Sequence, residues 1–411
     1  MLNHAGQNQS NQAFRLSITI IGWGLFVAML GQPSWIGSLP IKFLLKDTFH
    51  FQPHELALFL TLGSAAWYLK PAVAVFTDSV PINGSSRRIY LLLGSGGAMS
   101  LWLLLLVTPR TSGTLLTMIM LLNLAVVMAS TVLGGVIVEV GQQYSATGRI
   151  SSMRSMVKNC AVMIAGPLTG FLSLRFLGLT AAIGASLFAS LFILACFLPE
   201  RVNISPDLKA WQNAKLRIYE LFHAKSLWAA ASMLFLVQLA PGFNTPLFFY
   251  QTNVLQFEGP FIGILNLASG FSGVLAGLVY AYGCRRFPLR SLLFFAIVFH
   301  AASSLAYLGY NTKNSAVFIE CLGGFATVLA QIPLFDLAAR AVPKGCEALG
   351  YSLMMSFWNF GVDASDVFGS WLFELYGLNL TDLVWINCGS TLLTLFVFGI
   401  VPAHLHSKTD H

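Results

Sequence analysis

Six polar side chains lie at helical spacing on an otherwise apolar segment near the C-terminus. Successive members are four, three, four, three and four residues apart, the spacing of one helical face; they are Ser352, Ser356, Asn359, Asp363, Asp366 and Ser370. A carboxylate that lacks a partner in a poorly solvated position takes up a proton more readily than one in water. Asp363 is therefore the first candidate for reversible proton binding, and Asp366 is a further one. The alternative is a hydrated and chemically inert aspartate.

Other charged and amide side chains also fall inside apolar segments. A charge at the centre of a membrane costs at least about 2.5–3.5 kcal/mol, so each is expected to have a partner, water or a function. Glu320 is a second candidate for proton binding. The basic residues that could attract an anionic ligand, and the amides that could hydrogen-bond it, are Lys70, Arg154, Lys158, Gln238, Asn244 and Asn359. The alternative for the lysines is that their long side chains reach the membrane surface.

Motifs for enzymatic chemistry are missing from the sequence. The six cysteines form no C-x-x-C pair and the eight histidines no H-E-x-x-H pattern, so we expect no metal site. A G-x-x-x-x-G-K-[ST] phosphate loop is absent as well. The sequence therefore predicts neither an enzyme nor an ATP-driven pump, and no cofactor.

Composition indicates that lipid surrounds most of the chain. Of 411 residues, 56% are apolar and 9% are charged, against roughly 25% charged residues in soluble domains. The formal net charge of +7 is spread over short joints without a basic cluster, which argues against nucleic acid as a partner. We therefore expect an integral membrane protein whose partner is the bilayer.

Apolar windows of membrane-spanning length recur along the chain. Helices are expected, because a spanning segment must satisfy its own backbone hydrogen bonds and the short alternating strands of a barrel are absent. The predicted spans are 17–40, 55–77, 89–108, 114–139, 152–174, 179–198, 227–251, 260–282, 290–310, 315–338, 349–372 and 381–403. The fold class is accordingly all-α and integral membrane, with twelve transmembrane helices.

The longest polar joint divides these spans into two six-helix halves. It predicts an N-terminal bundle over 1–199, a cytoplasmic linker over 200–226 and a C-terminal bundle over 227–411, as in transporters built from two repeats. No clear sequence repeat is visible, so this symmetry rests on the number and spacing of the spans. Most of the 23 Lys and Arg residues lie in joints on the side of the N-terminus. This bias predicts a cell inner-membrane protein with both termini in the cytoplasm.

Prolines predict irregular helices in two of the spans. Pro71 cannot donate a backbone hydrogen bond and so frees the carbonyl of Trp67, which predicts a bend beside Lys70. Pro241 and Pro246 predict that the seventh span is a broken helix that lines a cavity.

Charged residues near the cytoplasmic ends of the spans predict contacts that form in one access state and break in another. Glu139 is expected to pair with an arginine at the start of the following span. Asp336 and Arg340 are four residues apart, where a local ion pair is expected. The gate candidates are Asp78, Arg87, Arg88, Glu139, Arg149, Asp336 and Arg340.

The joint 78–90, DSVPINGSSRRIY, resembles the loop signature of the major facilitator superfamily, with an acidic residue, a turn and two arginines between the second and third spans. Lys70-Pro71, Glu139 and the segment 333–340, PLFDLAAR, narrow the resemblance to the folate–biopterin transporter family over about 45–377. The resemblance implies a major facilitator-like fold and secondary transport of a folate- or pterin-like anion by alternating access. The intramembrane carboxylates predict that protons drive it.

The sequence departs from that family pattern at three positions. Ser130 and Gly134 stand where the pattern has aspartates in the fourth span, and Ser85 stands where it has an aromatic residue. In this superfamily the fourth span lines the central cavity, so the solute and the coupling ion stay open. The alternative function is a facilitator-type transporter of an unrelated metabolite or drug.

Overall fold

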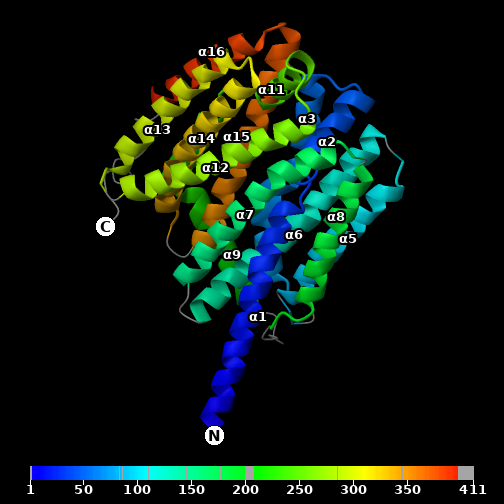
Figure 1. The fold of residues 1–411 in the computed structure, drawn as a ribbon. Coiled ribbons are helices and arrows are strands. Elements are labelled where there is room, and N and C mark those ends of the chain that lie inside the picture. The colour runs from blue at the N-terminus through cyan, green and yellow to red at the C-terminus, as the bar shows by residue number, and fades with distance from the viewer. Residues whose placement is uncertain are drawn as a thin grey trace. The chain divides into compact units, whose positions relative to one another are not determined.

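The described chain is helical and folds as two compact units. A computed structural model describes residues 2–82, 84–85, 87–109, 111–143, 147–175, 177–199, 208–284, 286–343 and 346–396. One unit comprises Met1–Ile41 and Gly63–Ala214, and the other comprises Lys42–Leu62 and Lys215–His411. The segment Lys42–Leu62 therefore packs with the C-terminal part of the chain, from which it is distant in sequence (Figure 1).

The helices of the first unit are α1 (Leu2–Leu30), α4 (Lys70–Ser79), α5 (Arg88–Val107), α6 (Ser112–Gln143), α7 (Thr147–Ser173) and α8 (Leu177–Ala195). Those of the second are η1 (Leu44–Thr48), α10 (Lys225–Gln238), α11 (Asn244–Phe249), η3 (Tyr250–Val254), α12 (Gly259–Gly283), α13 (Leu289–Ser304), η4 (Leu305–Gly309), α14 (Lys313–Ala341), α15 (Glu347–Leu375) and α16 (Leu380–Leu393). The chain passes between the units within α2 (Ser38–Phe43), α3 (Pro53–Ser64) and α9 (Leu208–His223), and η2 (Ala65–Leu69) follows α3.

Eight described segments are long and apolar enough to cross a bilayer: 53–77, 88–107, 112–137, 156–173, 177–195, 259–283, 289–309 and 313–341. Leu16–Leu30 and Leu380–Phe396 are shorter apolar helices. Each of these overlaps a predicted span. The two remaining predicted spans correspond to the broken α10–α11 and to α15. The all-helical, multi-pass class is thus confirmed, whereas the count of twelve stays a prediction.

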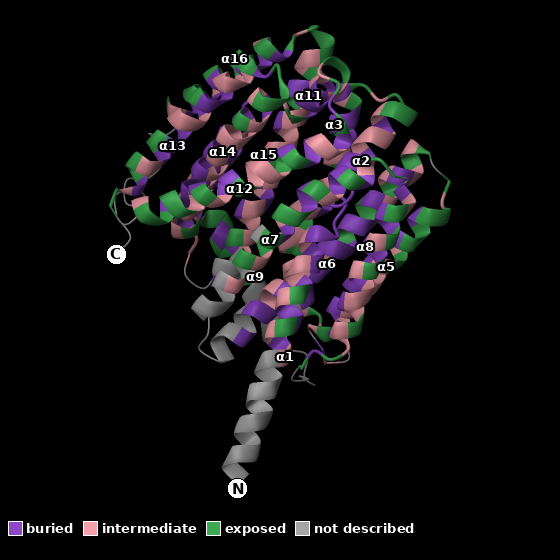
Figure 2. Cartoon of the chain, viewed as in Figure 1, coloured by how far each residue is buried: buried purple, intermediate pink, exposed green. Residues whose placement is uncertain are grey.

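Large apolar side chains are exposed on the surfaces of these helices, where a bilayer would cover them. Val107, Leu278, Phe295 and Phe318 are each more than half exposed, and exposed positions alternate with buried ones along α12, α13 and α14 (Figure 2). A water-soluble protein rarely exposes apolar surface on this scale.

Trp102 fixes the packing of the first unit. Its indole N–H donates to the carbonyl oxygen of Gly31 at 3.0 Å, and its ring is fully buried. The ring lies against Gly184 of α8, where an added Cβ would come within 2.6 Å of it. A glycine is needed there because α5 and α8 run side by side (Figure 1).

Small residues also let helices approach closely in the second unit. A Cβ on Gly324 of α14 would overlap the backbone of Ser269 on α12, and a Cβ on Gly273 of α12 would lie 2.8 Å from Val328. Such contacts between small residues are typical of helix pairs in membranes. They explain why α12 and α14 form a close pair.

The seventh span is broken, as its prolines predict. Residues 239–243 separate α10 from α11, and neighbouring helices bond the backbone groups that the break leaves free. Ser365 Oγ donates to the carbonyl oxygen of Ala240 at 2.7 Å, and Asn387 Nδ2 donates to that of Pro241 at 2.9 Å. Irregular backbone within a membrane requires such partners.

The second span is interrupted beside Pro71, also as predicted. The 3-10 segment η2 separates α3 from α4, in which Pro71 is the second residue. The carbonyl of Trp67, which proline was expected to leave free, accepts from the backbone N–H of Lys70. The tighter 3-10 bonding therefore satisfies the group that the proline cannot.

One irregular backbone motif occurs twice in the second unit. The π-helical segments η1 and η3 are each followed by a residue with positive φ, His50 (55°) and Gln256 (54°). In each copy the next residue, Phe51 or Phe257, donates its backbone N–H back to a carbonyl of the π turn. Corresponding residues of the two copies are separated by a constant number of positions in the sequence. The first copy follows the first predicted span, and the second copy begins at the end of the seventh. Sequence inspection missed this repeat because the side chains of the copies differ.

Candidate functional site

Asp366 of α15 faces the broken seventh span, and both of its carboxylate oxygens accept hydrogen bonds. The backbone N–H of Thr245 donates to Oδ1 at 2.9 Å, and the Thr245 hydroxyl donates to Oδ2 at 2.6 Å. Thr245 is fully buried. An N–H in the first turn of a helix has no partner within that helix, so Asp366 stabilises the start of α11.

Replacing Asp366 by alanine is expected to lower the free energy of unfolding by about 1–3 kcal/mol, because the change leaves a buried donor unpaired. Thermal unfolding of the purified protein in detergent measures this loss. Glu258→Ala is a matched control, since Glu258 is exposed and its side chain makes no capping bond. An Asp366→Ala protein as stable as the control would contradict the capping role.

Asp363 does not meet the premise that made it the first candidate for proton binding. That premise was a carboxylate without a partner, but in the structure Asp363 is not free of interactions. The residue is half-buried, and its backbone carbonyl accepts a hydrogen bond from the Thr61 hydroxyl at 3.4 Å. The proton-binding roles of Asp363 and Glu320 stay predictions.

Glu320 of α14 lies among phenol groups. The Tyr310 hydroxyl donates to Oε1 at 3.1 Å, and the Tyr307 hydroxyl also hydrogen-bonds the carboxyl group. The amide of Gln251 donates to the Tyr310 oxygen at 2.7 Å. Among the residues that the structure describes, no Lys or Arg forms an ion pair with Glu320. A phenol donates to an ionised carboxylate and accepts from a protonated one, so this cluster suits both protonation states.

Lys70 lies at the interrupted second span, beside the fourth. Its Nζ donates to Ser130 Oγ at 3.1 Å and lies 5.2 Å from the centre of the Trp67 ring. Ser130 thus offers a neutral hydroxyl at a position where the family pattern has a carboxylate. Lys158 is exposed on α7 and is not free of partners either.

The three amides predicted to contact a solute all lie in the second unit. Gln238 ends α10, Asn244 begins α11 and Asn359 lies on α15. Within the described ranges, none of their side chains makes a hydrogen bond. Buried Asn123 and Gln251, by contrast, are both bonded. The three amides therefore keep donors and acceptors for a ligand.

Asp336 and Arg340 form the predicted local ion pair on α14. Arg340 Nε lies 2.9 Å from Oδ1 of Asp336, and Nη2 lies 3.0 Å from Oδ2. The Tyr280 hydroxyl of α12 also donates to Oδ2, at 2.9 Å. The pair therefore ties α14 to α12 within the second unit.

The other gate candidates belong to the first unit. The Arg87 guanidinium lies against α6 and leaves no room for a Cβ at Gly135. Arg87 and Arg88 both have interaction partners. The side chains of Asp78, Glu139, Arg149 and Arg154 lie outside the described residues, so the contacts predicted for them stay predictions.

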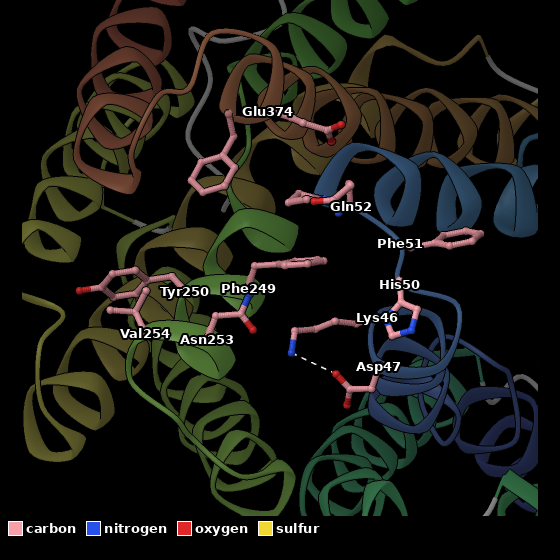
Figure 3. A pocket seen from close by; sticks show the side chains of 12 residues that line it. Lys46, Asp47, His50, Phe51, Gln52, Phe249, Tyr250, Asn253, Val254 and Glu374 are labelled. Carbon is pink, nitrogen blue, oxygen red and sulfur yellow. Dashed lines mark hydrogen bonds and ion pairs between the residues drawn. The ribbon is translucent and has the colours of Figure 1, made fainter.

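A pocket of about 640 Å³ opens at one end of the second unit (Figure 3). Its walls come from residues 46–53, residues 249–254 and the end of α15. The volume falls within the roughly 300–1,000 Å³ of small-molecule sites. Both π-helical segments contribute to the walls, and π-helical turns occur frequently at functional sites.

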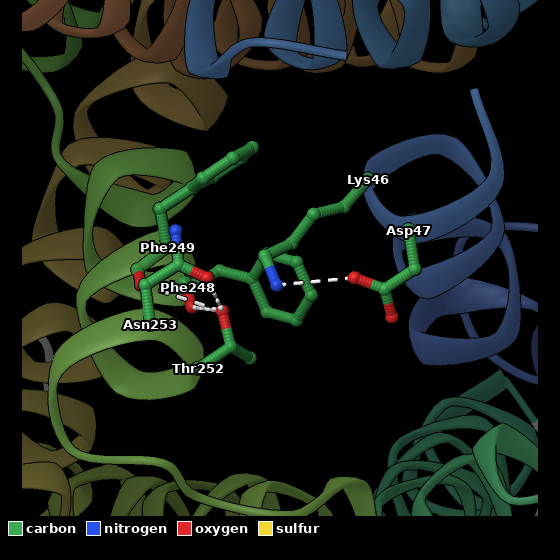
Figure 4. Close-up of polar contacts among 6 residues, drawn as sticks. All are labelled: Lys46, Asp47, Phe248, Phe249, Thr252 and Asn253. Atoms are coloured by element: carbon green, nitrogen blue, oxygen red, sulfur yellow. Dashed lines mark hydrogen bonds and ion pairs between the residues drawn. The ribbon is translucent and has the colours of Figure 1, made fainter. Parts of the chain in front are cut away.

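Charged and aromatic groups face each other in this pocket. Lys46 Nζ lies 3.1 Å from Asp47 Oδ1 and 6.0 Å from the centre of the Phe249 ring. Glu374 Oε2 accepts a hydrogen bond from the backbone N–H of His54 at 3.1 Å. Figure 4 shows the Lys46–Asp47 pair on one side and the η3 segment on the other.

Sequence reasoning missed this pocket because it searched for charges inside the spans. The lining residues lie in the joints after the first and eleventh predicted spans, and at the end of the seventh span with the joint that follows it. All three joints fall on the same side of the predicted topology, and this shared side is the signal that could have found them. No group of three or more His, Cys, Asp or Glu residues suited to a metal ion occurs among the described residues.

The described chain has the fold of solved membrane transporters. The chain matches a mutant of the nucleoside transporter NupG with a TM-score of 0.70 and 15% identity, covering 95% of this chain and 100% of that one. It matches a D-xylose–proton symporter with a TM-score of 0.68 and 13% identity, covering 97% of this chain and 98% of the symporter. At these identities the likeness is one of fold.

The chain belongs to the BT1 family, whose model matches residues 34–411. A folate–biopterin transporter of Synechocystis sp. (strain ATCC 27184 / PCC 6803 / Kazusa) is 29% identical over 394 residues, which cover 90% of this chain and 78% of that protein. Folate transporter 1 of Plasmodium falciparum (isolate 3D7) is 26% identical over 416 residues, which cover 93% of this chain and 79% of that protein. The family resemblance inferred from the motifs is confirmed, and the protein is a multi-pass membrane transporter, not an enzyme.

Proposed function

We propose that the protein carries a folate- or pterin-like solute across a membrane by alternating access, driven by protons. The observation that carries the solute class is the similarity to two transporters named for folate, each over about nine-tenths of this chain. The unbonded amides of Gln238, Asn244 and Asn359 support it, because a pterin ring offers several donors and acceptors along one edge. Lys70, Arg154 and Lys158 would attract an anionic form.

Alternating access follows from the proposed architecture of two six-helix bundles, 1–199 and 227–411, joined by a linker over 200–226. The repeated π-turn motif supports an origin from two equivalent halves. The proposed gate residues are Asp78, Arg87, Arg88, Glu139, Arg149, Asp336 and Arg340. Both termini face the cytoplasm in this proposal, and the membrane is the cell inner membrane.

Proton coupling is supported by the Glu320 cluster. A carboxyl group inside a spanning segment with hydroxyl partners alone binds and releases a proton without breaking an ion pair. Asp363 and Asp366 are weaker candidates than Glu320 for the residue that binds the coupling proton. Asp363 has another interaction partner, and Asp366 caps α11.

Uptake into proteoliposomes tests the proposed function. Labelled folic acid and biopterin are each supplied with and without an inward proton gradient. We expect uptake of at least one of them, and accumulation above the external concentration only with the gradient. Uptake of neither would refute the solute class. Uptake that the gradient does not change would favour the facilitator alternative, for which the neutral Ser130 beside Lys70 is the supporting observation.

A further inference from the structure

The pocket at the end of the second unit has no role in the function proposed so far. Its charged residues lie in joints between the predicted spans, whereas the candidates for proton and solute binding lie inside those spans. Three features of this pocket are typical of a ligand-binding site. They are a volume of about 640 Å³, two π-helical segments in its walls, and charged side chains that point into the same cavity (Figure 3). With the proposed orientation, it opens on the side opposite the cytoplasm.

Glu374 supplies an acceptor for a planar hydrogen-bonding edge. Its Oε2 is held by the backbone N–H of His54, which orients the carboxylate. Its Oε1 has no hydrogen-bond partner within the part of the chain that the structure describes. A carboxylate offers about four lone-pair positions, so Glu374 retains acceptors for two adjacent N–H groups. The 2-amino-4-oxo edge of a pterin presents such a pair of N–H donors.

Lys46 supplies a cation for an acidic tail. The side chain of Lys46 is 15% exposed, whereas that of its partner Asp47 is 55% exposed. A carboxylate on an exposed, neighbouring residue is largely solvated and contributes little binding energy. The ammonium group has three donors, so it can bind an incoming carboxylate while it keeps Asp47.

The wall between these two groups is aromatic. Phe249 lies between Lys46 and the end of α15 in Figure 3, with Tyr250 beside it. Aromatic rings pack well against a flat heterocycle. The distance of 6.0 Å between the Lys46 ammonium and the Phe249 ring centre places the cation at the edge of this wall.

We propose that this pocket binds the transported solute by a pteridine ring held between Phe249 and Glu374 and a carboxylate tail held by Lys46. The proposal rests on the proposed function, since it assumes a folate-like solute. It adds a second binding site, separate from the intramembrane residues. It also predicts that the two ends of the solute depend on different side chains.

Equilibrium binding to the purified full-length protein in detergent tests this division. The probes are folic acid, which has an acidic tail, and biopterin, which has the same ring edge and no carboxylate. Glu374→Gln is expected to weaken both about tenfold, as for the loss of a charged hydrogen-bond acceptor. Lys46→Gln is expected to weaken folic acid about tenfold and to leave biopterin within about twofold. Lys46 bonds no backbone group that the structure describes, so its variant stays interpretable if Glu374→Gln is unstable.

Glu258→Gln and Lys313→Gln are the matched controls. Glu258 is an exposed carboxylate at the start of α12, and Lys313 is an exposed lysine whose ammonium lies 5.5 Å from the ring centre of Phe261. Neither lines the pocket. Wild-type binding and transport combined with unchanged affinities in both pocket variants would overturn the pocket and leave the proposed function standing. A wild-type protein that neither binds nor transports either compound would overturn both.

Discussion

Replacing Glu320 by glutamine is expected to abolish accumulation driven by a proton gradient. One pH unit supplies about 1.4 kcal/mol per proton, which is about tenfold accumulation at one proton per solute. Glutamine keeps the shape of the side chain and an acceptor for the Tyr310 hydroxyl, but it cannot take up or release a proton. The internal to external solute ratio of the variant should therefore stay near one under the gradient that concentrates the solute in wild type.

Exchange of internal for external solute without a gradient separates lost coupling from lost folding. Glu320→Gln should retain this exchange, because the exchange needs the carrier and not the proton. Tyr310→Phe removes one of the hydroxyl partners and should weaken accumulation less than Glu320→Gln does. Glu258→Gln serves as the control with an exposed carboxylate. Gradient-driven accumulation by Glu320→Gln equal to that of wild type would assign the proton to another residue.

Replacing Gly369 by alanine is expected to destabilise the protein severely. Gly369 of α15 lies so close to the break in the seventh span that an added Cβ would overlap the carbonyl of Gly242. The backbone N–H of Gly242 also donates to the carbonyl of Ser365 at 3.0 Å, so neither segment can retreat without losing a hydrogen bond. Overpacking usually costs 1–3 kcal/mol and occasionally more. Because the neighbour is backbone, we expect a loss of about 3 kcal/mol or greater.

Size-exclusion chromatography after heating measures this loss on small amounts of protein. Gly389→Ala on α16 is the control, because an added Cβ there meets nothing within 4 Å. Alanine is also the better helix former by about 1 kcal/mol, so the control should be as stable as wild type or more so. Equal melting of the Gly369 and Gly389 variants would show that the seventh span can move away from α15.

Features that depend on a single residue could be predicted from sequence. Pro71 and Pro241 interrupt their helices wherever the helices pack, because a ring that lacks an N–H has a purely local effect. The ion pair of Asp336 with Arg340 is local as well, since helical geometry alone brings side chains four residues apart together. The family resemblance depended on such local motifs, and it covered most of the chain.

Features that depend on distant partners could not be predicted. The sequence alone does not distinguish Asp366 from Asp363. In the fold, Asp366 is hydrogen-bonded by Thr245 from another helix. Glu320 ranked second because nothing in its own segment shows that Tyr310 and Gln251 converge on it. The pocket depends on distant partners as well, since three segments far apart in sequence form its walls.

The two copies of the π-turn motif give the pocket a shared scaffold with unlike side chains. Lys46 and Asp47 occupy in the first copy the places that Thr252 and Asn253 occupy in the second. Duplication of an ancestral gene of half the length would leave such a pair, with the backbone kept and the residues diverged. An ancestor made of two identical halves would have carried the same groups on both walls. Of the two π-turn copies, the first alone contributes charged side chains to the lining, and Glu374 adds a carboxylate from α15. This asymmetry gives the present pocket a polarity, so a molecule with unlike ends has one preferred direction within it.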